Sequence, residues 1–196
     1  MRRLAKTPVT PNQVTTLRLV TGLGAAAAFA LGSDPFWNLG AGIFVLSVLL
    51  DRADGELARL SGKASNTGHV YDLFADAICN AVILFGLGVG LRDSQFGSWA
   101  IPMGALAGGA VAAILTLNVR MERAAGERSA ELPSFAGFDV DDAILLVPMA
   151  VWLGWKVPLL VAATICAPAF AIAFAWMCRR KLADARGPGA PIARDR

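Results

Sequence analysis

Cysteine and histidine, the residues that build most disulfide frameworks and zinc sites, are scarce in this sequence. The 196 residues include only 3 cysteines and 1 histidine. Cys79, Cys166 and Cys178 lie in or beside apolar runs and form no C-x-x-C pair, which argues against a disulfide framework and against a zinc site. The single histidine, His69, excludes a histidine-rich metal centre, and we expect it to be a polar side chain at an interface.

Charged residues are also few, and apolar residues dominate the remainder. Asp, Glu, Lys and Arg make up 17% of the chain against 56% hydrophobic residues, and the mean hydropathy is +0.55. Soluble domains of this size rarely reach such a value, whereas membrane proteins do, because lipid replaces water around most of their surface. Gly104 and Gly108 form a G-x-x-x-G pair within one apolar run. That pair predicts close helix packing, either within the chain or between two copies of it.

Six apolar stretches predict an all-α integral membrane protein with six transmembrane helices. A spanning helix needs about 20 residues, and only the fifth stretch is clearly short. In the sequence TPNQVTTLR, Thr10 is a suitable N-cap and Pro11 suits the first helical position. The second helix is predicted to continue into the acidic residues that follow its apolar part. The predicted spans are residues 14–31, 35–50, 70–91, 99–119, 141–155 and 157–178.

The basic residues are distributed unevenly between the two membrane faces that these spans define. All of the 18 Lys and Arg residues except Arg92 and Lys156 fall on the side of the N-terminus, which by the positive-inside rule makes both termini cytoplasmic. Contact with anionic lipid explains this excess without nucleic acid as a partner. We expect one transmembrane domain over residues 1–181, opening with a short basic segment, 1–10, and a disordered cytoplasmic tail over 182–196.

One polar segment interrupts the apolar pattern at residues 49–80, LLDRADGELARLSGKASNTGHVYDLFADAICN. Asp51 and Asp54 are three residues apart and Asp72 and Asp76 are four apart, so each pair shares one face of its helix. The loop SGKASNTG between the pairs is short and rich in Gly, Ser and Asn, which makes the two helices antiparallel neighbours. The four aspartates are therefore expected to converge at the cytoplasmic interface.

Converging carboxylates near hydrocarbon need protonation or a cation to offset their repulsion. Oxygen ligands with no His or Cys among them suit a hard cation, Mg²⁺, Mn²⁺ or Ca²⁺, and the spacing has room for two ions. Gly55, Ala58 and Gly68 would leave space for a ligand against the helix backbone, and Arg59 could grip a phosphate with two N–H groups. The simpler interpretation is a solvated loop with charges at helix ends, which suits Glu56 better than four spaced aspartates.

The same residues match a known pattern, D-x-x-D-G-x-x-A-R, eight residues, then G-x-x-x-D-x-x-x-D. The chain reads DRADGELAR, LSGKASNT and GHVYDLFAD, and over these 26 residues it resembles the CDP-alcohol phosphotransferase family. The six helices, the cytoplasmic ends and the position of the motif on helices two and three are also similar to that family. All eight fixed positions are present: Asp51, Asp54, Gly55, Ala58, Arg59, Gly68, Asp72 and Asp76.

The resemblance implies a membrane transferase of phospholipid biosynthesis. A CDP-linked alcohol, often CDP-diacylglycerol, donates its phosphatidyl-type group to a hydroxyl acceptor, and CMP leaves. The resemblance also implies a homodimer in the bacterial cytoplasmic membrane, with the active site on the cytoplasmic face. Asp76 is implied to deprotonate the acceptor hydroxyl. Two Mg²⁺ or Mn²⁺ ions would be held by Asp51, Asp54, Asp72 and Asp76. The CDP-alcohol site would comprise Asp51, Asp54, Gly55, Ala58, Arg59, Gly68 and Asp72.

Two other functions are compatible with an acidic metal site in a membrane. A divalent-cation carrier would use the aspartates for coordination, but they cluster at one face instead of near mid-membrane, where transporter sites usually lie. An intramembrane prenyltransferase also uses aspartate-rich metal sites, but its two motifs lie on different helix pairs, whereas this chain has one composite motif.

The acceptor alcohol is the part of the function that the sequence determines least. Arg120, Arg123 and Arg128 lie on the cytoplasmic side. They could bind the phosphate of an acceptor such as inositol phosphate or glycerol phosphate, or they could serve topology alone. Three acidic residues before the fifth span could stabilise a helix N-terminus or line the acceptor pocket. These are Asp139, Asp141 and Asp142.

Overall fold

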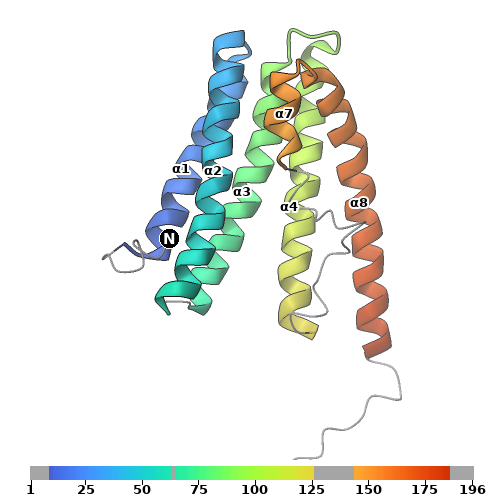
Figure 1. Ribbon diagram of the computed structural model, residues 1–196. Helices are drawn as coiled ribbons and strands as arrows, with labels where there is room; N and C mark the ends of the chain where they lie inside the picture. Colours follow the sequence, from blue (N-terminus) through green and yellow to red (C-terminus); the bar gives the residue numbers. More distant parts are fainter. Residues whose placement is uncertain (1–8, 63–64, 126–143, 186–196) are drawn as a thin grey trace, which may run out of the picture.

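The computed structural model is helical throughout the parts of the chain that it describes, which are residues 9–62, 65–125 and 144–185. The long helices lie side by side along one direction (Figure 1), and each is long and apolar enough to cross a membrane. They are α1 (Pro11–Leu31), α2 (Asp34–Ser61), α3 (Asn66–Gly90), α4 (Ala100–Ala125) and α8 (Lys156–Ala185). Two short elements accompany them, the 3₁₀ turn η2 (Gly97–Trp99) and the helix α7 (Leu146–Trp152).

The all-α architecture is confirmed for the described residues, and five of their helices are candidate membrane spans by length and composition. Helix α7 has seven residues, which at 1.5 Å per residue is too short for about 30 Å of hydrocarbon. Part of the predicted fifth span, residues 141–143, lies outside the described residues, so a sixth span stays a prediction. Helix α8 continues past residue 181, where we expected the tail to begin, and residues 1–8 and 186–196 lie outside the description.

Helix α1 begins as the sequence predicts. The Thr10 side chain accepts a hydrogen bond from the Gln13 backbone N–H at 3.4 Å, and the Thr10 backbone N–H donates to Gln13 Oε1 at 3.0 Å. Pro11 is the first helical residue, and because proline has no backbone N–H, this position leaves no amide unpaired. This reciprocal cap satisfies two of the amide groups that a helix start leaves free.

The hairpin between α2 and α3 is tighter than predicted. Helix α2 continues through the acidic segment, as expected, and ends at Gly62, whose φ of 64° is the left-handed conformation that glycine adopts easily. Helix α3 begins four residues before the expected position 70. The reason is Ser65, whose hydroxyl accepts a hydrogen bond from the Gly68 N–H at 3.0 Å and caps a helix inside the predicted loop. Gly68 is therefore a helical residue.

Close approach of α3 and α4 depends on the predicted glycine pair. A Cβ atom on Gly104 would lie 2.5 Å from the Leu84 carbonyl oxygen and 2.9 Å from the Gly88 Cα, and one on Gly108 would collide with the Ala81 carbonyl. Real side chains do not tolerate such distances, so the two backbones touch here without intervening side chains. Of the two roles that the G-x-x-x-G pair suggested, packing within the chain is confirmed.

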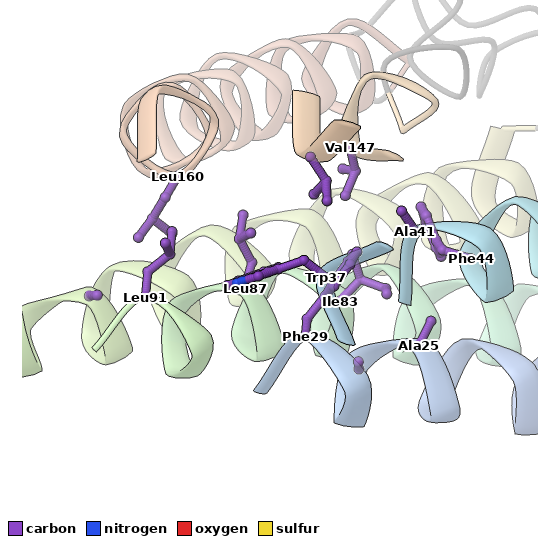
Figure 2. Packing of buried hydrophobic residues seen from close by; sticks show 13 residues of the cluster. Ala25, Phe29, Trp37, Ala41, Phe44, Ile83, Leu87, Leu91, Val147 and Leu160 are labelled. Carbon is purple, nitrogen blue, oxygen red and sulfur yellow. The ribbon is translucent and has the colours of Figure 1, made fainter. Parts of the chain in front are cut away.

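Large apolar side chains fill the middle and one end of the bundle. Figure 2 shows residues of α1, α2, α3, α7 and α8 pointing toward one another, with Trp37 beside Phe29 at a ring-centroid distance of 5.4 Å. Val147 of α7 and Leu160 of α8 close this cluster from the other side. A second, smaller cluster joins α4 to α8 around Ile114. Helix α1 begins, α2 ends and α3 begins at the bundle end away from α7 (Figure 1), and that end carries the polar residues.

Candidate active site

Three of the four motif aspartates converge. Carboxylate oxygens of Asp51 on α2 and of Asp72 and Asp76 on α3 all lie within 4.8 Å of one another. Their side chains are partly exposed, at 36%, 32% and 26% in the same order. The antiparallel hairpin predicted from the spacing therefore does bring carboxylates of both helices together. Such a group of oxygen ligands, open on one side, can bind a hard cation and leave positions for a substrate.

A buried arginine of α1, which the sequence interpretation assigned to topology alone, lies against these carboxylates. The Arg18 side chain is only 4% exposed. Its Nη1 lies 2.6 Å from Asp51 Oδ1 and 2.8 Å from Asp72 Oδ1, and its Nη2 donates to Asp76 Oδ1. The site is thus built from three helices, not from one hairpin. A signal was available in the sequence, because an ionisable residue inside an apolar span is a functional candidate by default.

Asp54 stands apart from the other three aspartates. It is 3% exposed, and its Oδ2 accepts a hydrogen bond from Thr15 Oγ1 of α1 at 2.7 Å. Its Oδ1 is buried and accepts no hydrogen bond from any described residue. A buried carboxylate oxygen without a donor is costly unless a ligand supplies the partner. Together with the all-oxygen character of the neighbouring group, this orphaned atom shows that the residues present fit Mg²⁺ or Mn²⁺.

A cavity of about 210 Å³ opens beside the aspartates. Most of the residues that the motif assigned to the CDP-alcohol site line it, namely Asp54, Gly55, Ala58, Gly68 and Asp72. The glycines and the alanine keep its walls close to the helix backbone. At Gly68 an added Cβ would lie 3.0 Å from Ser65 Oγ and 3.1 Å from Asn12 Oδ1, which shows how closely α1 and α3 meet there.

Two members of the predicted CDP-alcohol set do not line the cavity. Asp51 belongs to the carboxylate group instead. Arg59 is exposed, and its Nε donates to the Gly55 carbonyl one turn earlier at 3.3 Å. The guanidinium lies over Gly55, with Nη2 4.0 Å from where a Cβ would be, so it is next to a lining residue of the cavity without lining the cavity itself.

Further lining residues were not predicted. They come from the first turns of α1 and the start of α3: Pro11, Asn12, Thr15, Ser65 and His69. Sequence reasoning used the first of these as a helix start and the histidine as an interfacial side chain. Only the folded bundle shows that the first turn of α1 forms one wall of the cavity, because contact between α1 and α3 has no local sequence signal.

The predicted acceptor residues are only partly described. Arg120 is exposed near the end of α4, which is the bundle end that holds the aspartates (Figure 1). The Arg123 side chain lies outside the described part of the structure. The same holds for the whole of Arg128, Asp139, Asp141 and Asp142.

Comparison with known proteins matches the family that the motif suggested. The sequence model of the CDP-alcohol phosphatidyltransferase family covers residues 8–177. The chain is 36% identical over 89 residues to archaetidylinositol phosphate synthase of Pyrococcus horikoshii, which is 45% of this chain and 46% of that protein. It is 34% identical over 87 residues to a bifunctional IPC transferase and DIPP synthase of Rubrobacter xylanophilus, 44% of this chain and 19% of that protein. The matched part is less than half of either relative.

A solved structure shares the whole fold. The crystal structure of Mycobacterium tuberculosis phosphatidylinositol phosphate synthase with CDP-DAG bound superposes with a TM-score of 0.66. The superposition covers 100% of this chain and 96% of that one, at 22% sequence identity. At this identity the likeness establishes the arrangement of the helices.

Proposed function

Because the chain belongs to the CDP-alcohol phosphatidyltransferase family, we propose that it transfers a phosphatidyl group from CDP-diacylglycerol to a hydroxyl of inositol phosphate and releases CMP. The observation that carries this proposal is the carboxylate group of Asp51, Asp72 and Asp76 beside the cavity of about 210 Å³. Inositol phosphate is favoured over glycerol phosphate by the printed name of the Pyrococcus relative, archaetidylinositol phosphate synthase. The structural neighbour with bound CDP-DAG supports the donor.

Two Mg²⁺ or Mn²⁺ ions would be held by the four motif aspartates, and they would neutralise charge on the donor pyrophosphate. Asp51, Asp72 and Asp76 offer converging oxygens, and the orphaned Oδ1 of Asp54 adds a fourth. We expect EDTA to stop CMP release and added Mg²⁺ or Mn²⁺ to restore it. CMP release that persists in EDTA would contradict the metal part of the proposal.

The cavity suits the CDP end of the donor. Gly55, Ala58 and Gly68 allow the nucleotide to approach the helix backbone, and Asn12 and Ser65 offer hydrogen-bonding groups to it. Arg59 next to Gly55 adds a charge that complements phosphate. The diacylglycerol chains would leave the site toward the surrounding lipid, which explains why a water-soluble nucleotide and a lipid are handled at one end of the bundle.

Asp76 is the proposed general base. In the transfer, the acceptor oxygen bonds to the phosphorus that carries the diacylglycerol. The bond from that phosphorus to the oxygen bridging the two phosphates breaks, and this oxygen leaves with CMP. The acceptor proton passes to a carboxylate oxygen of Asp76. Support comes from the last aspartate position of the motif, which Asp76 occupies, and from its partial exposure of 26% within the carboxylate group. Arg120, Arg123 and Arg128 are proposed to attract the acceptor phosphate.

The membrane orientation is part of the proposal. The described chain begins and ends, at the start of α1 and the end of α8, at the bundle end that holds the aspartates (Figure 1). The excess of basic residues on that side favours the cytoplasmic face of the cytoplasmic membrane, where CMP can leave into water. A homodimer is proposed by similarity to the family.

The decisive experiment measures CMP release from CDP-diacylglycerol by the purified full chain in detergent with Mn²⁺. Inositol phosphate, glycerol phosphate and free inositol are compared as acceptors. We expect inositol phosphate to give a rate at least about tenfold above free inositol, since losing a charge-assisted phosphate contact costs a factor of this order. We also expect it to react faster than glycerol phosphate, which keeps the phosphate but lacks the inositol ring. No CMP with any acceptor would overturn the transferase, and a faster rate with glycerol phosphate would overturn the acceptor.

A further inference from the structure

Arg18 is a fixed positive charge inside the bundle. The side chain is 4% exposed, and the Arg18 backbone carbonyl accepts a hydrogen bond from Ser47 Oγ of α2 at 3.0 Å. A guanidinium stays protonated at any accessible pH, so it needs negative partners at all times when it is buried. The three carboxylates that supply this charge come from two other helices. Arg18 therefore ties α1 to both members of the acidic hairpin.

The carboxylates that accept from Arg18 are the same ones whose oxygens converge as cation ligands. Asp51 Oδ1 and Asp72 Oδ1 both lie within 3 Å of Arg18 Nη1, and Asp76 Oδ1 accepts from Nη2. A divalent cation bound by these groups would share them with the guanidinium, and the two like charges would repel each other across a short distance in a partly dry site.

We propose that Arg18 is a positioning residue that acts as the resident counter-charge of this site. It holds Asp51, Asp72 and Asp76 together when no divalent cation is bound, and it weakens cation binding by competing for the same oxygens. The inference rests on the proposed function only in taking a divalent cation as the ligand. If Arg18 has this role, the three carboxylates are already in place before the cation binds, and the bound cation remains exchangeable.

The test is the Mn²⁺ affinity of the purified full chain, measured from the electron paramagnetic resonance signal of free Mn²⁺. Arg18→Lys keeps a charge but has a shorter reach and no planar fork, so the affinity should rise about threefold. Arg18→Gln removes the charge, and the affinity should rise at least about tenfold. Arg92→Gln is the matched control. It removes one cation from the opposite end, where Arg92 donates to the Ala30 and Val89 carbonyls, and it should change the affinity less than about twofold.

Melting temperatures in EDTA and in Mn²⁺ separate this role from a structural one. Both Arg18 variants should melt lower than wild type in EDTA, and Mn²⁺ should raise their melting temperatures by more than it raises that of the wild type. If Arg18→Gln does not fold, Arg18→Lys carries the test alone. Equal or weaker Mn²⁺ binding in the Lys variant would overturn the inference. If neither the wild type nor any variant binds Mn²⁺, the proposed cation site is wrong as well. That outcome differs from one in which the wild type binds Mn²⁺ and the Arg18 variants do not bind it more tightly.

Discussion

At the scale of single residues, Asp54 and Asp76 belong to the same motif but have different surroundings. Asp54 is 3% exposed and fixed by a hydroxyl of α1, whereas Asp76 is 26% exposed and accepts from Arg18 within the carboxylate group. A residue that takes a proton from an incoming acceptor must be reachable, and a residue that holds a ligand must be fixed. The partial exposure of Asp76 is compatible with the base role proposed for it, and the burial of Asp54 suits the proposed placement of a ligand.

Replacing Asp76 tests whether it acts as the general base. Asp76→Asn keeps the size of the side chain and its ability to accept from Arg18, but the amide cannot take a proton. We expect kcat for CMP release to fall about 10²- to 10⁴-fold, with CDP-diacylglycerol affinity within about threefold of wild type. The matched control is Asp93→Asn, because Asp93 is 89% exposed beyond the end of α3. A kcat within tenfold of wild type in Asp76→Asn would show that another group takes the proton.

The hydrogen bond from Thr15 to Asp54 makes a second prediction. Thr15→Val removes the donor at 2.7 Å from a buried carboxylate whose other oxygen, Oδ1, has no hydrogen-bond partner among the described residues. The free energy of unfolding should fall by about 1–3 kcal/mol, and the melting temperature of the purified protein measures it. Thr15→Ser restores the hydroxyl and should recover most of the loss. Thr16→Val is the exposed control, and a loss as large in that variant would contradict the specific role of Thr15.

Residue spacing predicted that four aspartates converge, and three of them, Asp51, Asp72 and Asp76, do so, because helical periodicity and a short loop are local properties. Spacing was not enough to place Arg18 or Thr15. Both belong to α1, and their contacts with the aspartates span 33 to 58 residues of sequence. Neither the charge count nor the span pattern says which helix packs on the hairpin. The capping of α3 by Ser65 was also missed, since a loop rich in Gly, Ser and Asn contains several suitable caps.

At the scale of helices, the bundle depends on a few glycines that let backbones touch. Contact of α3 with α4 passes through Gly88 and Gly104, whose Cα atoms are close enough that a Cβ on either would lie 2.9 Å from the other. This contact fixes the direction of α3, and α3 carries Asp72 and Asp76. The close contact near the C-terminal end of α3 therefore influences the position of the aspartates near its N-terminal end.

Two glycines of α4 with different surroundings allow a matched comparison. Gly104→Ala places a methyl group 2.5 Å from the Leu84 carbonyl, where backbone must move, whereas Gly109→Ala meets no atom within 4 Å. We expect Gly104→Ala to lower the free energy of unfolding by about 1–3 kcal/mol, as overpacking does. Gly109→Ala should be neutral or stabilising by up to about 1 kcal/mol, because alanine favours the helix. Equal melting temperatures for the two variants would show that the close contact of α3 and α4 does not contribute to stability.

At the scale of the whole molecule, the larger apolar cluster and the polar site occupy different ends of the bundle. The aromatic pair Phe29 and Trp37 lies where α1 ends and α2 begins, and Lys156 at the start of α8 lies over the Trp37 ring. The carboxylates, Arg18 and the cavity lie where α1 begins and α2 ends. One end can therefore hold the helices together while the other presents polar groups to a nucleotide and to water.

The number of membrane crossings is the remaining property of the whole molecule that an experiment must decide. Helix α4 ends at the bundle end that holds the aspartates, and α8 begins at the opposite end (Figure 1). Six crossings with cytoplasmic termini then require Ala125 and Ala185 to face the cytoplasm, and Asp93 and Gly154 to face the other side. The positive-inside bias predicts the same assignment, because Arg92 and Lys156 are the only basic residues expected on that other side.

Reporter fusions at these four positions test the topology directly. Green fluorescent protein fused after Ala125 or Ala185 should fluoresce, since it folds in the cytoplasm. Alkaline phosphatase should be active only when it is fused after Asp93 or Gly154, because it needs the oxidising periplasm to form its disulfides. Each site receives both reporters, so each serves as the control for the other. A fluorescent fusion after Gly154 would remove the sixth crossing, and phosphatase activity after Ala185 would move the aspartate site away from the cytoplasmic nucleotide that it is proposed to use.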